Sequence, residues 1–156
     1  MKNRILRVEA EQVMLPILTQ LRKLGKVEVC GSYRRKCPDL GDIDLVGSKP
    51  EMIVELTRMG EVLNAGSRKA EVLIPYKGDK VQVDIYFATR AEWVPMIMFL
   101  TGSADENKRL RFIAKSKGWK LNQYGLWDGE RCLSKGMSEE KIYALLGQEY
   151  KVPERR

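Results

Sequence analysis

Two short stretches of this sequence carry residue types that could do chemistry. One is a Gly-Ser pair followed by arginines, Gly31-Ser32-Tyr33-Arg34-Arg35, and the other is Gly41-Asp42-Ile43-Asp44 ahead of an apolar run. Alternate side chains of a strand share a face, so Asp42 and Asp44 are predicted to point the same way, about 6.6 Å apart along the chain. Adjacent carboxylates repel one another unless protons or cations intervene, and hard divalent cations prefer oxygen ligands. The pair therefore predicts a metal site, with the Gly-Ser backbone and Arg35 receiving an anionic ligand such as a nucleoside triphosphate.

The composition limits which other chemistry is open. The chain has 156 residues, a formal net charge of +7 and no histidine. Without histidine, Ser-His-Asp and Cys-His catalysis and imidazole-based zinc sites are excluded. The three cysteines form no metal-ligand spacing and are expected to be reduced, as in an intracellular protein. The positive charge predicts a polyanionic partner, and no apolar stretch is long enough to span a membrane.

The elements that must position these residues follow from the periodicity of the apolar residues. Helices are predicted over residues 8–24 and 51–59, and strands over 26–30, 41–47, 72–75 and 81–87. From residue 92 the pattern changes to an apolar helix over 92–100, a basic helix capped by Ser103 and Glu106, a hairpin over 119–128 and a helix over 138–146. A boundary between two parts of the chain is predicted near residues 89–92.

A third acid lies in the strand predicted over residues 81–87. Alternation places Val81, Val83 and Ile85 on the core face, so Asp84 falls on the opposite face. One interpretation is an acid facing solvent on an edge strand. The other, which we favour, makes Asp84 a third ligand of the metal cluster formed by Asp42 and Asp44.

The order and spacing of these motifs resemble the nucleotidyltransferase superfamily and, within it, the family X DNA polymerases. The resemblance rests on five segments: residues 29–35 with 41–44, the strand around Asp84, Phe99-Leu100-Thr101-Gly102-Ser103 with Asn107, the segment 121–126, and the tail 150–155. It covers nearly the whole chain. It implies an α+β fold: a palm over residues 1–90, with a mixed sheet and helices on one face, followed by a small α/β lobe over 91–156. The chain is similar to the minimal viral members of the family, which lack the lyase domain.

The resemblance also implies an activity, namely DNA-directed addition of dNTPs to a primer 3′-hydroxyl, with short-gap filling in DNA repair as the expected role. Catalysis and metal binding are assigned to Asp42, Asp44 and Asp84, with Mg²⁺ as cofactor and Mn²⁺ as a substitute. The implied nucleotide-binding residues are Gly31, Ser32, Arg35, Phe99, Thr101, Gly102, Asn107 and Arg4. The implied DNA contacts are Lys108, Arg109, Arg111, Lys115, Lys117, Gln82 and Tyr124. The partners expected are gapped or primer–template DNA and dNTP, with no membrane, and the protein is expected to be a monomer.

The sequence departs from the family pattern at two places. Phe99-Leu100 stands where Tyr-Phe is usual, and Gln82 occupies a position often held by arginine. These changes bear on ribonucleotide discrimination and on placement of the primer terminus.

Two alternative functions stay open. One alternative function is a template-independent transferase. The other is a non-catalytic module that binds DNA ends.

Overall fold

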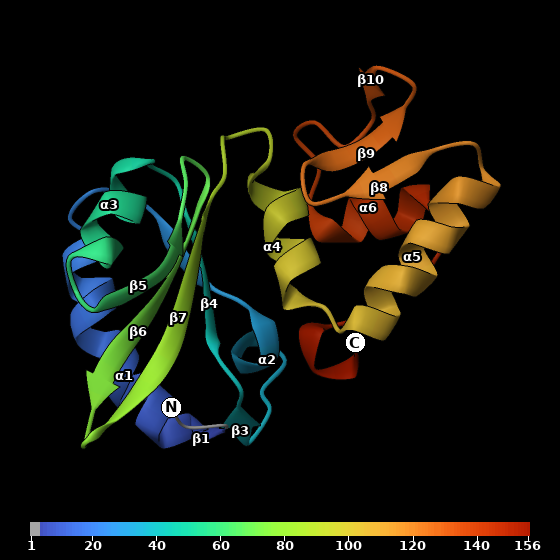
Figure 1. The fold of residues 1–156 in the computed structure, drawn as a ribbon. Helices are drawn as coiled ribbons and strands as arrows, with labels where there is room; N and C mark the ends of the chain where they lie inside the picture. Colours follow the sequence, from blue (N-terminus) through green and yellow to red (C-terminus); the bar gives the residue numbers. More distant parts are fainter. Residues whose placement is uncertain (1–3) are drawn as a thin grey trace.

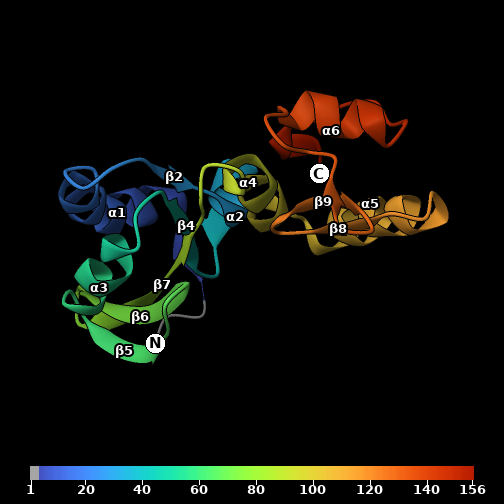
Figure 2. The same ribbon diagram turned by 90° about the horizontal axis from the view of Figure 1, so that it is seen from above.

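The chain folds into two lobes that lie side by side with helix α4 between them (Figures 1 and 2). The computed structural model describes residues 4–156. The N-terminal lobe consists of β1 (Ile5–Leu6), α1 (Arg7–Leu21), β2 (Val27–Val29), α2 (Gly31–Arg34), β3 (Asp39–Leu40), β4 (Ile43–Gly47), α3 (Glu51–Thr57), β5 (Glu61–Ala65), β6 (Lys69–Tyr76) and β7 (Asp79–Phe87). The C-terminal lobe consists of α4 (Trp93–Thr101), α5 (Ala104–Ser116), β8 (Lys120–Asn122), β9 (Gly125–Asp128), β10 (Arg131–Cys132), α6 (Glu139–Leu145) and a final 3-10 turn (Pro153–Arg155).

The N-terminal lobe is built on a five-stranded mixed sheet with the strand order β2-β4-β7-β6-β5. Strands β4 and β7 run parallel, while the other neighbours are antiparallel. The parallel register sets Asp44 directly beside Asp84. This mixed sheet and its helices confirm the predicted α+β class.

The two faces of this sheet are covered differently. Helix α1 buries its apolar stripe, from Ala10 to Leu21, together with α3 against the alternate apolar residues of β4, β6 and β7. This is the 3.6-residue periodicity that predicted the helix, and Pro16 lies within it. On the opposite face, Val46 and Ala88 pack against Met96 and Ile97 of α4. Helix α4 therefore joins the two lobes at one end of that face.

The C-terminal lobe has a separate core. It contains Met98 of α4, Leu110 and Ala114 of α5, Leu126 of β9, and Ile142, Tyr143 and Leu146 at α6. The predicted cap of α5 is half confirmed, because the Ser103 hydroxyl accepts a hydrogen bond from the Glu106 backbone N–H at 3.4 Å. The Glu106 carboxylate does not complete a capping box. It is buried and accepts hydrogen bonds from Arg109 and the Tyr143 hydroxyl.

Several local features differ from the prediction. Strands β1, β3, β5 and β10 were not predicted, and β6 begins at Lys69 rather than at residue 72. The Gly-Ser segment forms the short helix α2 instead of a turn, entered through Gly31 at a φ of 60°. A positive φ is strained for a residue with a Cβ atom, so glycine permits this entry. Among the described residues, no helix has the length and apolar character needed to cross a bilayer.

Candidate active site

The three acids predicted from the sequence converge at one point of the sheet face opposite α1 and α3. One carboxylate oxygen from each of Asp42, Asp44 and Asp84 can be chosen so that all three lie within 4.8 Å of one another. Asp44 and Asp84 are brought together by the parallel pairing of β4 with β7, and Asp42 lies one residue before β4. The Gln82 amide donates a hydrogen bond of 3.0 Å to Asp84 Oδ1. The structure therefore provides a three-carboxylate cluster of the type that binds hard cations.

The electrostatics of this cluster favour the uptake of positive charge. Burial, together with repulsion from Asp42 and Asp84, raises the pKa of Asp44 to about 7. Burial is also the main reason that the pKa of Asp84 rises to about 6 and that the pKa of Asp42 is raised. When all three carboxyl groups are ionised, their negative charges repel one another in a partly buried site. Bound protons or cations relieve this repulsion.

Helix α2 presents the Gly-Ser segment directly beside the acids. The Cys30 N–H donates to the Asp44 backbone carbonyl at 2.8 Å, which ties the start of α2 to β4. A Cβ atom on Gly31 would lie 2.4 Å from Asp44 Oδ2, so only glycine fits at this approach. Ser32 follows, with its hydroxyl in no hydrogen bond to the described residues. The segment predicted to receive an anionic ligand thus lies next to the three carboxylates.

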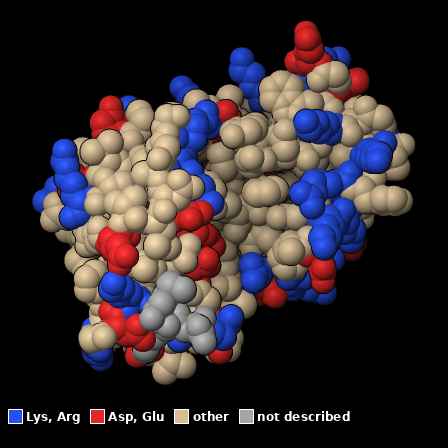
Figure 3. Space-filling model, viewed as in Figure 1, with Lys and Arg blue, Asp and Glu red and all other residues tan. Residues whose placement is uncertain are grey.

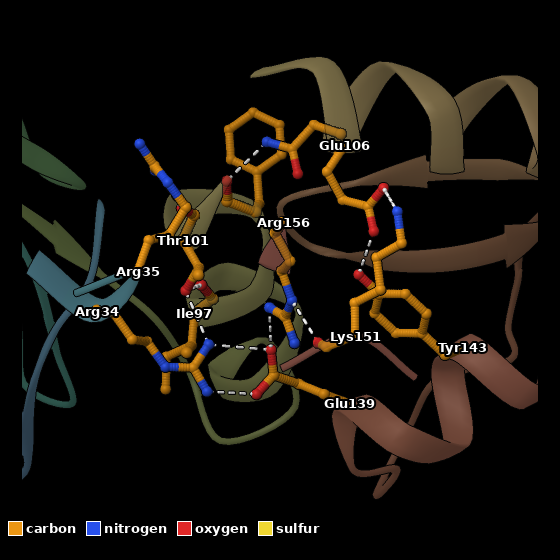
Figure 4. A network of polar contacts seen from close by, with 11 residues as sticks. Arg34, Arg35, Ile97, Thr101, Glu106, Glu139, Tyr143, Lys151 and Arg156 are labelled. Carbon is orange, nitrogen blue, oxygen red and sulfur yellow. Dashed lines mark hydrogen bonds and ion pairs between the residues drawn. The ribbon is translucent and has the colours of Figure 1, made fainter. Parts of the chain in front are cut away.

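The two arginines of the motif tie the N-terminal lobe to the C-terminal lobe (Figure 4). Arg35 donates to the Thr101 carbonyl at 2.6 Å. Arg34 donates to the Thr101 hydroxyl at 2.8 Å and binds Glu139 of α6 through both terminal nitrogens, at 3.1 and 2.5 Å. The Thr101 hydroxyl in turn donates to the Ile97 carbonyl at 2.6 Å. The arginines at the end of α2 therefore bind both the end of α4 and the start of α6.

Glu139 is the acid at the centre of this contact. It also accepts a hydrogen bond of 2.8 Å from Arg156, whose side chain is 1% exposed and lies over the rings of Tyr143 and Tyr150, 5.4 Å from each centroid. Burial alone would raise the pKa of Glu139, but the hydrogen bonds from Arg34 and Arg156 outweigh it and lower the pKa. Glu139 is therefore held ionised between two guanidinium groups, one from each lobe.

Several of the predicted nucleotide-binding residues already have protein partners. The Asn107 amide donates to the Phe99 carbonyl at 2.8 Å, which keeps both residues at the mouth of the same small pocket. A Cβ atom on Gly102 would lie 3.2 Å from Arg35 Nη1, so this glycine is close to the arginine motif. Arg4 is bound to Asp39 at 2.5 Å, and its charge offsets part of the burial-driven rise in the pKa of Asp42.

The predicted DNA contacts separate into two groups. Lys108, Arg111, Lys115 and Lys117 are exposed, whereas Arg109 binds Glu106 at 2.6 Å and the Gln148 side-chain oxygen at 2.7 Å. Figure 3 shows Lys and Arg side chains gathered over the C-terminal lobe, across a hollow from Asp and Glu side chains on the N-terminal lobe. Tyr124, at the tip of the β8–β9 hairpin, lies under Arg68 of the N-terminal lobe, 5.3 Å from ring centroid to guanidinium carbon. Carboxylates and cations therefore face each other across the space between the lobes.

Two charged residues beside the cluster were missed by the sequence analysis. Glu71 pairs with Asp84 across β6 and β7, and Lys69 pairs in the same way with Tyr86. Lys69 binds Glu71 at 2.6 Å, and its charge offsets part of the rise in the pKa values of all three acids of the cluster. Extending the alternation of residues 72–75 backwards by three positions would have placed both residues on this face.

Comparison with known proteins agrees with this geometry. Residues 4–74 match the family model of the DNA polymerase beta palm, and residues 96–156 match that of the DNA polymerase beta thumb. The repair DNA polymerase X of African swine fever virus is 30% identical over 136 residues, which cover 81% of this chain and 78% of the viral protein. This chain belongs to the family X DNA polymerases.

This polymerase is also similar to larger proteins. It is 28% identical over 146 residues to the DNA polymerase/3′-5′ exonuclease PolX of Bacillus subtilis, which covers 89% of this chain and 25% of the bacterial protein. It is 24% identical to rat DNA polymerase lambda over an alignment of 189 positions, which covers 99% of this chain and 33% of that protein. As a family X member it is a nucleotidyltransferase. Its cluster of Asp42, Asp44 and Asp84 is consistent with a metal-dependent active site.

Proposed function

We propose that this polymerase fills short gaps in DNA by adding dNTPs, opposite a template, to a primer 3′-hydroxyl. In this reaction the 3′-oxygen attacks the α-phosphorus of the dNTP, a new phosphodiester bond forms and pyrophosphate leaves. The observation that carries the proposal is the convergence of Asp42, Asp44 and Asp84 within 4.8 Å, beside a Gly-Ser segment and Arg35. The name of the viral relative, a repair polymerase, supports the gap-filling role.

The donor set fits Mg²⁺, with Mn²⁺ as a substitute, because it consists only of carboxylate oxygens. Asp42, Asp44 and Asp84 would hold such ions, which would supply positive charge to stabilise the attacking and leaving oxygens of the displacement. We assign Asp84 to the side of the cluster that faces the primer terminus. The raised pKa values of Asp44 and Asp84 mean that binding releases protons from these carboxyl groups.

The α2 segment and the end of α4 are the proposed triphosphate and sugar contacts. Gly31 lets the backbone approach, while Ser32 and Arg35 donate hydrogen bonds to the phosphate oxygens. Arg35 is already held by the Thr101 carbonyl, so it is oriented before the nucleotide arrives. Phe99, Thr101 and Gly102 are proposed to form the wall beside the sugar, and Asn107 to contact the base. Arg4, from its position near Asp42, is proposed to add a further cation on the phosphate side.

DNA binding is assigned to exposed basic side chains of the C-terminal lobe. Lys108, Arg111, Lys115 and Lys117 are proposed to contact phosphates, with Gln82 and Tyr124 near the primer end. Arg109 remains assigned as a DNA contact, but it must exchange its Glu106 partner to act in this way. Because phosphate contacts release counterions, affinity is expected to fall steeply as salt is raised.

Extension of a primer across a one-nucleotide gap tests the proposal. Each dNTP is offered singly against each template base in Mg²⁺, with Asp42→Ala and Asp84→Asn as test variants and Asp128→Asn, an exposed acid of β9, as the matched control. Incorporation that follows the template, is lost in both test variants and is kept in the control supports the proposal. Incorporation regardless of template would assign the chain to terminal transferases. DNA binding without any incorporation would favour a non-catalytic module that binds DNA ends.

A further inference from the structure

Helix α5 presents an exposed face that the packing of the C-terminal lobe does not use. Glu106, Leu110 and Ala114 form its buried side. The opposite side carries Phe112, which is 74% exposed, the highest value among the large apolar residues of 4–156. A phenylalanine left in water forgoes roughly 2 kcal/mol of burial free energy, so a free surface position gives this ring no structural benefit.

The residues around Phe112 on this face are cations. Lys108 lies four residues before Phe112, Arg111 lies one before it and Lys115 three after it. All four side chains therefore project from one side of the helix. None of the three cations makes a hydrogen bond or ion pair with any described residue. Arg109, which follows Lys108 in the helix, instead donates hydrogen bonds to the side chains of Glu106 and Gln148. The face therefore combines unpaired positive charge with an aromatic ring.

This face begins at the proposed nucleotide site. Arg111 lines the same small pocket as Phe99 and Asn107. From Lys108 to Lys115 the helix rises about 10 Å, which is the length of about three stacked nucleotides at 3.4 Å each. A strand that leaves the nucleotide site along α5 would thus pass Phe112 within one or two nucleotides.

We propose that Phe112 stacks on an unpaired template base just beyond the templating position, while Lys108, Arg111 and Lys115 bind the phosphates on either side. The inference rests on the proposed polymerase function and adds a contact to single-stranded DNA. A phenyl ring cannot donate or accept conventional hydrogen bonds, so it does not read the base edges that a duplex exposes in its grooves. An unpaired base offers a flat π-face instead, and the cations supply charge complementarity to its backbone.

The test measures binding of the 156-residue chain to two DNA ligands. One is a primer–template with a single-stranded template overhang, and the other is a blunt duplex of the same paired length. Phe112→Leu removes the aromatic face but keeps an apolar side chain. We expect this variant to bind the overhang DNA about tenfold more weakly and the blunt duplex with less than a twofold change, with the salt dependence of binding unaltered.

Two further variants distinguish stacking from general weakening. Lys115→Ala is expected to weaken binding of both ligands and to lower the slope of log affinity against log salt by about 0.7–0.9. Leu15→Ala, which removes a 69% exposed apolar side chain from α1, is the matched control and is expected to change neither. A 2-aminopurine placed at successive template positions reports stacking directly. Its fluorescence should change on binding at one position beyond the templating base, and that change should be lost in Phe112→Leu.

The outcomes separate this proposal from the proposed function. Equal loss on both ligands, or no loss for Phe112→Leu, overturns the stacking contact even if gap filling proceeds. If the wild-type chain fails to incorporate nucleotides by template while Phe112→Leu still selectively loses the overhang DNA, the polymerase function fails and the single-strand contact stands.

Discussion

Replacement of Asp44 by asparagine is expected to stabilise the metal-free protein at neutral and alkaline pH. The folded protein raises the pKa of this carboxyl from its usual 3.8 to about 7, because Asp44 is buried and lies beside Asp42 and Asp84. Each pKa unit corresponds to about 1.36 kcal/mol, so ionising Asp44 in the folded state costs about 4 kcal/mol more than in the unfolded chain. The side chain keeps partial access to solvent, which screens the charge and reduces the expected effect to about 2–3 kcal/mol.

The sign of the pH dependence follows from which state holds the proton. Between about pH 4 and pH 7 the folded protein keeps Asp44 protonated while the unfolded chain does not. The free energy of unfolding contributed by this group is therefore highest below pH 4, falls as pH rises through that window, and is level above it. The substituted asparagine has no charge to gain, so Asp44→Asn should match the wild-type protein near pH 4 and exceed it by about 2–3 kcal/mol at pH 8.

Urea unfolding followed by circular dichroism, in EDTA and at several pH values, measures this difference. In thermal unfolding at pH 8, Asp44→Asn should raise the melting temperature by about 8 °C, since 1 kcal/mol corresponds to about 2–4 °C in a chain of this size. Asp128→Asn, an exposed acid, is the control and should change little. Added Mg²⁺ should stabilise the wild-type protein but much less the variant, because the substitution removes one carboxylate of the proposed cation site. A variant that is less stable than wild type at pH 8 in EDTA would refute the reasoning, since ionised Asp44 would then not be unfavourable in the fold.

Two further changes test the contacts around the site. Glu139→Gln should lower the free energy of unfolding by about 3 kcal/mol in urea titrations, because it leaves Arg34 without its carboxylate in a largely buried contact. The neighbouring exposed Glu140→Gln should change it by less than about 0.5 kcal/mol, and equal effects would contradict the assignment. Gly31→Ala should lower primer extension about 100-fold, because its Cβ would lie 2.4 Å from Asp44 Oδ2 and displace a proposed metal ligand. Unchanged extension by this variant, measured at saturating dNTP, would show that the close approach is not needed.

The core of the site could be predicted from the sequence because its geometry is local. The spacing of Asp42 and Asp44, and the alternation around Asp84, place each acid on a polar strand face without knowledge of the rest of the chain. The parallel pairing of β4 with β7, which brings the two strands together, was not predicted. Position and face were therefore predictable, while the exact pairing needed the structure.

The remaining parts depend on contacts between distant segments. Arg34 and Glu139 are 105 positions apart, and no local pattern links an arginine after the Gly-Ser pair to an acid at the start of a late helix. Lys69 and Glu71 were missed because Ala70, the small residue between them, weakens the apolar alternation that defines a strand. Strand β5 was missed for a related reason: all five of its residues are exposed, so it has no buried face to produce a pattern.

The pairing of Arg34 with Glu139 has a consequence for recombination between relatives. A chimera that joins the N-terminal lobe of this chain to the C-terminal lobe of another family member brings Arg34 against whatever residue stands in place of Glu139. It also brings Val46 and Ala88 against whatever replaces Met96 and Ile97. Exchange of the lobes as independent modules should therefore succeed only when the donor carries a carboxylate at the start of its own α6. The two lobes are in this sense a matched pair, and a recombination point placed after α4 would keep their apolar contact while leaving the ion pair to be supplied by the donor.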